Sequence, residues 1–446
     1  MDKKKGITQT LAEFVVNTRP RNIPEESLHA AKRCLLDWLG LALVGSGHRA
    51  VAMLLDVLGA GASGEAKVIG RPERLDLLNA AMIHAYMAHV YDYDDTHIPG
   101  MVHPSAPVWA PVITLSTRVK VSGLDALLAF ILGYEVETRL GMALEPLQLE
   151  RQWHVTGLVG GPGASAAAGK LLNLTVEQQK SAFGIAGTYA SGLLAVSGSM
   201  SKGLNPGKAA HSGLFAALAA KKGLTSAHDV FDSRRGFFRV HAGRTDVAGI
   251  VLSGFGKGYQ VVRNSFKPYP CGFLGHASID SMLGVRKEHS FQASDVSRIR
   301  LQVNPHVLDA MGERSPRTGL EGKFSVYHCV ASALVDGACA LQHFTDEKVK
   351  DEKIAAVRGK ITSETVPSFG ITEAHIAVVL NDGQIFEKHV TRASGMEGNP
   401  LSDEQLQAKF EENARTVLNA EVTAEVARRV WKIEACTDVR DLLALM

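Results

Sequence analysis

The chain has 446 residues, of which 46% are hydrophobic and 21% are charged, and its formal net charge at pH 7 is +2. This length allows two or three domains with a large core, and a near-neutral charge without a basic, aromatic-rich stripe argues against nucleic acid as the main partner. Five scattered cysteines form no CxxC pair, which indicates reduced thiols in a cytoplasmic protein rather than a zinc or iron–sulfur site. The N-terminal segment contains Glu13 and is too short and mixed for a secretory signal.

The first two-thirds of the chain has the pattern of packed helices. Residues 23–45 begin with Pro24 and two acids, which suit a first helical turn, and then become apolar at helical spacing. Residues 74–94, 123–144, 175–187 and 207–224 continue this pattern, with Gly and Pro breaks between them. Few β-branched runs interrupt these segments, so we predict a tightly packed helical bundle.

One window raises the question of a membrane span. Residues 181–201 contain no charge, and their length alone is sufficient to cross a bilayer. The window also contains four Gly and five Ser, and no second such segment exists in the sequence. We therefore predict a buried central helix, whose small residues allow close approach of neighbouring backbones, and no membrane partner.

The pattern changes near residue 267. Residues 297–305 alternate like a strand that ends at Pro305, and residues 374–393 form two strand patterns around the turn signal Asn381-Asp382-Gly383. Ser402 and Gln405 then begin another helix with a capping box. The sequence predicts a mainly α protein with a helical domain from both chain ends, 1–266 plus 396–446, and an inserted α+β domain at 267–395.

The stretch VYDYDDTHIPGMVHPS, residues 90–105, concentrates ionisable groups. Asp92, Asp94 and Thr96 match the DxDxT motif of a class of phosphatases, but that chemistry needs a preceding buried strand and a later acidic pair for Mg²⁺. The residues before Asp92 have a helical pattern instead, so the phosphatase is a remote alternative. A charged helix end that faces water is a further interpretation, although the helix dipole disfavours three acids there.

Two glycine-rich stretches resemble nucleotide-binding motifs only superficially. Residues 161–166 imitate a dinucleotide fingerprint, but no strand precedes them and no acid follows about twenty residues later. Residues 163–170 are one residue too long for a P-loop. Close helix packing explains both stretches, and we expect no cofactor.

Five cationic or titratable residues stand beside Gly or Pro: His103, His154, Lys202, Lys267 and His276. Each alone is more often a satisfied or solvent-facing side chain than a catalyst. Together they predict a cationic, histidine-rich site. Such a site suits an acidic substrate and proton transfer near neutral pH.

Four pieces of the sequence together resemble the MmgE/PrpD family: DYDDTH with the following HPS, QWHVTG, SMSKGLNPGKAAHSG and KPYPCGFLGH. In order and spacing, the resemblance extends over about residues 30–440. The resemblance implies a helical domain with an inserted α+β lid, a homodimer, no metal requirement, and an active site between the domains. It implies these site residues: Asp92, Thr96, His103, His154, Lys202 and His276, with Lys267 in support.

The reaction that the resemblance implies is proton transfer at the carbon next to a carboxylate of a small polycarboxylate. His103 is the expected general base, with His154 as second choice, and Lys202 is the expected acid on the opposite face. Asp92 would tune a His or Lys partner. The substrate's carboxylates would be bound by the remaining residues: Thr96, Lys267 and His276.

The link between DDT and HPS indicates a branch of the family. Only HIPGMV lies there, and His97 stands where the dehydratase branch usually has Trp. This short link and the modest chain length favour a substrate smaller than 2-methylcitrate, so epimerisation of iminodisuccinate is the first expectation. Dehydration of 2-methylcitrate and decarboxylation of cis-aconitate are the alternatives. A non-catalytic binding protein with the family fold is a rival, but it has no need of clustered His and Lys.

Overall fold

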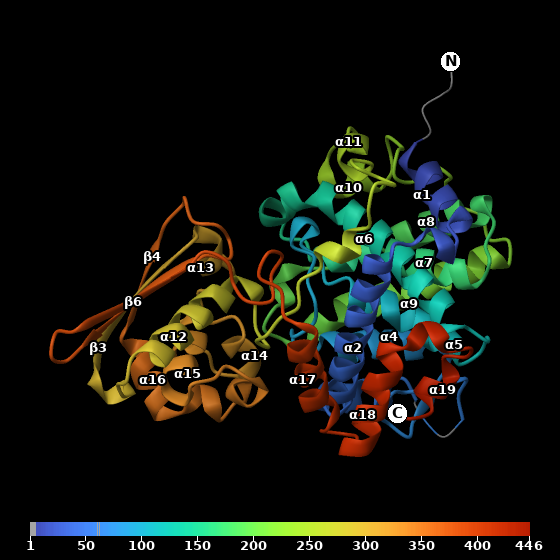
Figure 1. Ribbon diagram of the computed structural model, residues 1–446. Helices are drawn as coiled ribbons and strands as arrows, with labels where there is room; N and C mark the ends of the chain where they lie inside the picture. The colour runs from blue at the N-terminus through green and yellow to red at the C-terminus, as the bar shows by residue number, and fades with distance from the viewer. Residues whose placement is uncertain (1–5, 60, 62) are drawn as a thin grey trace.

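The computed structural model describes residues 6–59, 61 and 63–446, with the backbone alone for 145–151. Helices dominate this part of the chain, which confirms the predicted mainly α fold with a small α+β part. Figure 1 shows a large helical body and, beside it, a smaller body that contains the sheet.

The larger body is built from helices of both chain ends. In chain order they are α1 (Ile7–Asn17), α2 (Glu25–Ser46), α3 (Arg49–Val57), α4 (Leu77–His89), α5 (Ser105–Ser116), α6 (Gly123–Arg151), α7 (Val155–Leu171), α8 (Val176–Thr188), α9 (Leu204–Lys221), α10 (Phe237–Ala242), α11 (Ala248–Val251), α17 (Asp403–Ala414), α18 (Ala420–Trp431) and α19 (Arg440–Leu443). A short antiparallel pair, β1 (Ala66–Lys67) with β2 (Arg74–Leu75), precedes α4.

Small residues let the central helices approach closely. A Cβ atom added at Gly133 of α6 would lie 2.7 Å from the carbonyl oxygen of Gly163 on α7, and one added at Gly163 would lie 2.9 Å from the carbonyl oxygen of Gly133. Only Gly fits at both positions, because neither backbone has room for a side chain. The glycine-rich stretch that imitates a nucleotide motif is therefore part of a helix contact.

The C-terminal helices return to the start of the chain. In Figure 1, α17 and α18 lie against α2, and both contacts are present in the structure. Ser402 caps α17 and exchanges hydrogen bonds with Gln405, which confirms the predicted capping box. Arg33 of α2 forms an ion pair of 2.7 Å with Asp403, so this end of the chain is fixed onto the helical body.

The smaller body contains a four-stranded sheet with the order β4-β3-β5-β6. Its strands are β3 (Val296–Val303), β4 (Ile361–Thr365), β5 (Ala374–Leu380) and β6 (Ile385–Val390). β3 pairs in parallel with β4 and antiparallel with β5. β5 and β6 form the predicted hairpin. The helices of this body are α12 (His276–Glu288), α13 (Pro305–Met311), α14 (Gly319–Gly322), α15 (Val326–Asp336) and α16 (Glu352–Gly359).

The two largest groups of buried apolar side chains correspond to the two bodies. One group draws on residues 7–266 and 401–446, and the other draws on residues 271–396. This division supports the boundaries expected from sequence, 1–266 with 396–446 and 267–395, which we retain as a proposal.

The prediction of a buried helix over residues 181–201 is correct as far as Thr188 and wrong beyond it. α8 ends at Thr188, and short 3₁₀ turns follow at Leu194–Val196 and Met200–Gly203. Tyr189 and Leu193 are 47% and 56% exposed, because Gly and Ser break the helix before its apolar residues are covered. Among the described residues no single helix is long and apolar enough to cross a membrane; α2 and α3, bent by 78° at their junction, pass the length and composition test only as a pair.

Candidate active site

The acidic segment that follows α4 is buried. Asp92, Asp94 and Asp95 are 4%, 1% and 0% exposed, so the interpretation as a charged helix end in water is wrong. Asp92 has a left-handed backbone with φ of 51°, a conformation that Asp tolerates better than most residues. The residues before it form helix α4 rather than the strand that a DxDxT phosphatase requires.

Two lysines from distant segments converge on the Asp92 carboxylate. The Nζ of Lys202, in the turn before α9, donates to Oδ1 at 2.7 Å. The Nζ of Lys267 donates to the same oxygen at 2.8 Å and to the backbone oxygen of Asp92 at 2.9 Å. The three residues are 9% exposed or less. One carboxylate therefore holds two ammonium groups in a buried position.

The electrostatics of this cluster favour an ionised aspartate. Burial alone would raise the pKa of Asp92, but the charges of Lys202 and Lys267 hold that pKa well below its usual value. Burial, together with the charge of Lys267, lowers the pKa of Lys202 although Asp92 opposes the shift. Lys202 is thus a cation that gives up its proton more readily than a solvated lysine.

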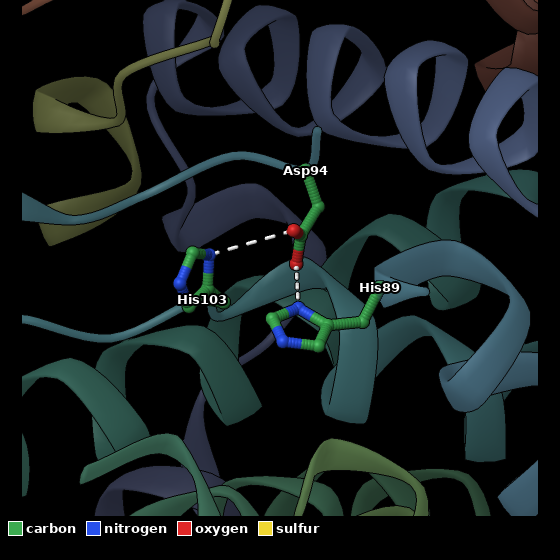
Figure 2. Close-up of side chains that lie close together, drawn as sticks. All are labelled: His89, Asp94 and His103. Atoms are coloured by element: carbon green, nitrogen blue, oxygen red, sulfur yellow. Dashed lines mark hydrogen bonds and ion pairs between the residues drawn. The ribbon is translucent and has the colours of Figure 1, made fainter. Parts of the chain in front are cut away.

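His89, the last residue of α4, connects Lys202 to a second carboxylate. Its Nε2 lies 3.1 Å from the Nζ of Lys202, and its Nδ1 lies 2.8 Å from Asp94 Oδ2. Figure 2 shows Asp94 between the rings of His89 and His103. Because an ammonium can only donate, Nε2 of His89 accepts, and Nδ1 carries the hydrogen that Asp94 receives.

His103 has a defined tautomer. Its Nδ1 lies 3.1 Å from the backbone oxygen of Asp95 and 3.5 Å from Asp94 Oδ1, and both of these neighbours accept hydrogen bonds only, so Nδ1 carries the hydrogen. The lone pair then remains on Nε2, which lies 4.0 Å from Asp92 Oδ1. Burial lowers the pKa of His103 well below its usual value, so a neutral base is present at neutral pH.

His154 and Thr96 complete the polar group. The ring of His154 stacks on that of His103 at a centroid distance of 6.2 Å, and its buried Nδ1 has no partner among the described residues. Burial, with the charge of Lys202, lowers the pKa of His154 well below its usual value. Thr96 Oγ1 lies 3.4 Å from His103 Nδ1, and its backbone pairs with Ser265.

A cavity of about 500 Å³ opens beside these groups. Asp92, His103, His154 and Lys202 line it from the larger body, and the turn before α12 (Gly272, Phe273 and Leu274), the end of α13 and Phe324 line it from the smaller body. The cavity brings together six of the seven residues predicted from sequence: Asp92, Thr96, His103, His154, Lys202 and Lys267.

Comparison with known proteins identifies the family of this chain. Residues 9–249 match the model of the MmgE/PrpD N-terminal domain, and residues 269–433 match that of the MmgE/PrpD C-terminal domain. The chain belongs to the MmgE/PrpD family. It is 29% identical to the cis-aconitate decarboxylase-like protein oryM of Aspergillus oryzae, covering 99% of this chain and 97% of that protein. It is 28% identical to the cis-aconitate decarboxylases of Mus musculus and Homo sapiens, again over 99% of this chain, and covers 93% and 95% of those proteins.

In this MmgE/PrpD family member, His276 stands apart from the other predicted residues. It begins α12, is fully buried, and does not line the cavity. Its Nε2 lies 3.4 Å from the backbone oxygen of Cys271, and its ring packs edge-on to Tyr269. His276 thus supports the turn just before the lining residues Gly272 and Phe273, and a direct contact with substrate stays a prediction from the resemblance.

Three of the buried groups also have the donor types of a metal site. Ligand atoms of His89, Asp94 and His103 lie within 4.8 Å of one another. The environment opposes a cation, because the ammonium of Lys202 already lies against the Nε2 of His89 and Lys267 lies against the same aspartate as Lys202. The arrangement fits a proton network better than a metal centre.

His89 and Asp94 are functional candidates that the sequence argument missed. A signal existed for His89, since it is a polar residue on the densely apolar helix α4. Its role depends on contact with Lys202, which is 113 residues away in the chain. Asp94 was noticed within the acidic motif but was not chosen, because only the folded structure shows which of the acids faces a histidine.

Proposed function

We propose that this chain is a lyase that decarboxylates a small polycarboxylate of the cis-aconitate type, with a proton delivered to carbon by protein side chains. The observation that carries the proposal is the placement of a neutral His103, with its lone pair on Nε2, beside the ammonium groups of Lys202 and Lys267 at one cavity. The similarity to cis-aconitate decarboxylases over 99% of the chain supports decarboxylation as the outcome.

The bond changes assign a task to each group. Cleavage of the bond between carbon and the leaving carboxylate releases CO₂ and leaves an electron pair on the allylic carbon. The double bond spreads this charge toward a neighbouring carboxylate, which gains enediolate character beside Lys202 and Lys267. One proton must then bind to carbon, so that the reaction consumes one proton for each CO₂.

His103 is the proposed source of that proton. The negative charges of a bound polycarboxylate raise the pKa of a nearby imidazole, so His103 takes up a proton from solvent as the substrate binds. Its Nε2 then delivers this proton to the carbanion and returns to the neutral form. Asp94 and the backbone oxygen of Asp95 keep Nδ1 protonated throughout, which directs the exchange to Nε2.

A second candidate is epimerisation of iminodisuccinate, the outcome first expected from sequence. One observation favours it: His103 Nε2 and Lys202 Nζ lie 4.0 Å and 2.7 Å from the same oxygen, Asp92 Oδ1. A base and an acid held beside one oxygen are close enough to act on the same substrate carbon, one by removing a proton and the other by returning it.

The test is incubation of the purified protein in D₂O with cis-aconitate, 2-methylcitrate and each stereoisomer of iminodisuccinate, followed by NMR. Release of CO₂ from cis-aconitate with one deuteron in the product supports the decarboxylase. Deuterium in iminodisuccinate with loss of optical purity transfers the assignment to the epimerase, and water loss from 2-methylcitrate transfers it to a dehydratase. No reaction with any of them contradicts polycarboxylate chemistry.

His103→Gln tests the proton donor. We expect turnover to fall by about 10²–10⁴-fold, the usual contribution of a positioned acid or base. The matched control is His84→Gln, since His84 is a fully buried histidine that hydrogen-bonds Thr114 in the bundle core and does not line the cavity. Equal turnover in the His103 variant and the wild type removes His103 from the mechanism.

A further inference from the structure

The cavity is divided into two chemically different parts. Its polar end holds Asp92, His103 and Lys202 with their neighbours. A second group of lining residues, which we call the apolar wall, consists of six side chains: Val155, Leu193, Leu194, Phe273, Met311 and Phe324. A site that served only a compact polycarboxylate would have no use for a wall of this kind, because carboxylates remain hydrated or pair with donors.

The charges at the cavity do not match a substrate with many carboxylates. Lys202 and Lys267 share the single charge of Asp92, which leaves the polar end with one surplus positive charge. Among the lining residues that the structure describes, no further Lys or Arg is present. The other ionisable lining residues are His103 and His154, which are neutral before substrate binds, and Asp309 of α13, whose side chain is 72% exposed. Asp309 adds no positive charge that could bind a further carboxylate.

The apolar wall is built rather than incidental. Met311 packs under the turn at Gly272, where an added Cβ would lie 2.9 Å from its sulfur. Phe324 lies beside the polar end, with its ring centroid 5.7 Å from the Nζ of Lys202. The amide of Leu194 donates to the backbone oxygen of Gln152 at 3.0 Å, so the loop that carries the exposed Leu193 is fixed at the cavity.

The volume of the cavity also supports a ligand with an apolar part. A cavity of about 500 Å³ falls within the range of pockets that enclose drug-sized ligands, roughly 300–1,000 Å³. Such pockets are lined mainly by apolar side chains, with a few placed polar groups that orient the ligand. The apolar wall, beside the few polar groups around Asp92, fits that description.

We infer that the substrate is a small di- or polycarboxylate that carries an apolar substituent, an alkyl chain of several carbons or a ring. The carboxylates bind at Lys202 and Lys267, and the substituent lies along the apolar wall toward Leu193 and Leu194. This inference rests on the proposed function for the reactive end of the molecule and adds the chemistry of the other end. The wall then determines specificity, because the polar end alone accepts any small carboxylate.

The test is a series of unreactive ligands measured by isothermal titration calorimetry: succinate, 2-butylsuccinate, 2-benzylsuccinate and propane-1,2,3-tricarboxylate. Each methylene group buried on the wall should tighten binding about fourfold. We expect 2-butylsuccinate and 2-benzylsuccinate to bind at least about tenfold more tightly than succinate and than the tricarboxylate. Equal affinity of succinate and 2-butylsuccinate, or tightest binding of the tricarboxylate, overturns the inference.

Two variants test whether the apolar wall causes the gain in affinity. Phe273→Ser should remove most of the gain of 2-butylsuccinate over succinate and leave succinate itself within about twofold. The matched control is Phe291→Ser, because Phe291 belongs to the same body but stacks on Phe386 and does not line the cavity. Leu194→Ser repeats the test on the larger body if Phe273→Ser does not fold. If 2-butylsuccinate still binds more tightly than succinate to both Phe273→Ser and Leu194→Ser, the apolar wall does not bind the substituent and the inference is contradicted.

Failure of this inference is distinguishable from failure of the proposed function. Turnover of cis-aconitate in D₂O without a preference for the substituted ligands overturns the inference and leaves the proposed function intact. A clear preference for 2-butylsuccinate without CO₂ release or deuterium exchange leaves the substrate class supported and overturns the reaction.

Discussion

Two buried aspartate–lysine pairs hold the same segment of this protein from two sides. Lys409 of α17 bonds Asp37 of α2 at 2.7 Å and the backbone oxygen of Tyr93 at 2.8 Å. On the other side, Asp92 forms its ion pair with Lys202 at the same distance of 2.7 Å, while Lys267 bonds the backbone oxygen of Asp92. Lys409 and Lys267 thus bind the backbone oxygens of two successive residues, Tyr93 and Asp92.

The pairs differ in the number of cations and in access. Asp37 has one lysine, and burial outweighs that partner and raises the pKa of Asp37. Asp92 has two lysines, which outweigh burial and lower its pKa. Lys409 is covered by the ring of Tyr93 at 3.9 Å, whereas Lys202 lines the cavity. The same ion pair is structural where the charges balance in a closed core, and suited to catalysis where a surplus cation meets an open cavity.

The variant Lys202→Met tests most directly whether the two ion pairs differ in role. The variant loses the cation that faces the cavity, so we expect kcat/KM to fall by about 10²–10³-fold. Folding should be preserved, because Lys267 still neutralises Asp92. Steady-state kinetics and urea unfolding measure the two effects. A loss of stability without a loss of activity would show that the pair at Asp92 is structural as well.

The reciprocal variant is Lys409→Met. It leaves Asp37 buried without a partner, so the free energy of unfolding should fall by about 3 kcal/mol, while kcat/KM measured well below the unfolding temperature stays within about threefold. The double variant Asp37→Leu/Lys409→Met removes both charges and should regain most of the stability. A drop in kcat/KM comparable to that of Lys202→Met contradicts the distinction between the two pairs.

The fold was largely predictable because local patterns determine it. Helical periodicity predicted the bundle, and Asn381-Asp382-Gly383 predicted the hairpin of β5 and β6. The parallel pairing of β3 with β4 was not predictable, since Ile299 and Ile361 are brought together by the intervening helices. The loop at 189–201 was not predictable, because a stretch without charges resembles a buried helix. Its apolar residues Leu193 and Leu194 line the cavity and do not pack in a helix contact.

The site was predictable only in part. Its residues come from separate segments, and the resemblance to the family supplied the information that Asp92, Lys202 and Lys267 meet. His89 was missed because its partner Lys202 is brought to it by the packing of α4 against the start of α9. His276 was included by the same resemblance, although the structure places it behind the cavity wall.

The pH dependence of stability can be compared between one histidine in the closed core and one at the cavity. Burial lowers the pKa of His84, in the closed core, to about 4 and also lowers that of His103 at the cavity. Unfolded histidine has a pKa of about 6.5, so below that pH the unfolded chain binds more protons than the folded chain. The free energy of unfolding should therefore decrease as pH falls from about 6.5, by up to about 1.4 kcal/mol per pH unit for each such histidine.

Urea unfolding between pH 7.5 and pH 5 measures this slope. His84→Gln should make the slope shallower by the share of one histidine, and His103→Gln should do the same, although of the two only His103→Gln lowers turnover by about 10²–10⁴-fold. A slope unchanged by either substitution contradicts the assignment of neutral histidines in the folded protein.

The smallest expected effect concerns His97, the residue that the sequence argument used to choose a branch of the family. His97 lies on the same segment as Asp92, but it is fully buried and does not line the cavity; its Nε2 lies 3.2 Å from Gln260 Oε1. His97→Gln should lower the free energy of unfolding by about 1 kcal/mol and change kcat/KM by no more than about threefold. Kinetics with cis-aconitate and 2-methylcitrate check this. If the His97→Gln variant instead catalyses loss of water from 2-methylcitrate, the prediction is contradicted. The conformation of the segment between Thr96 and His103 would then determine the reaction, in addition to the residues that line the cavity.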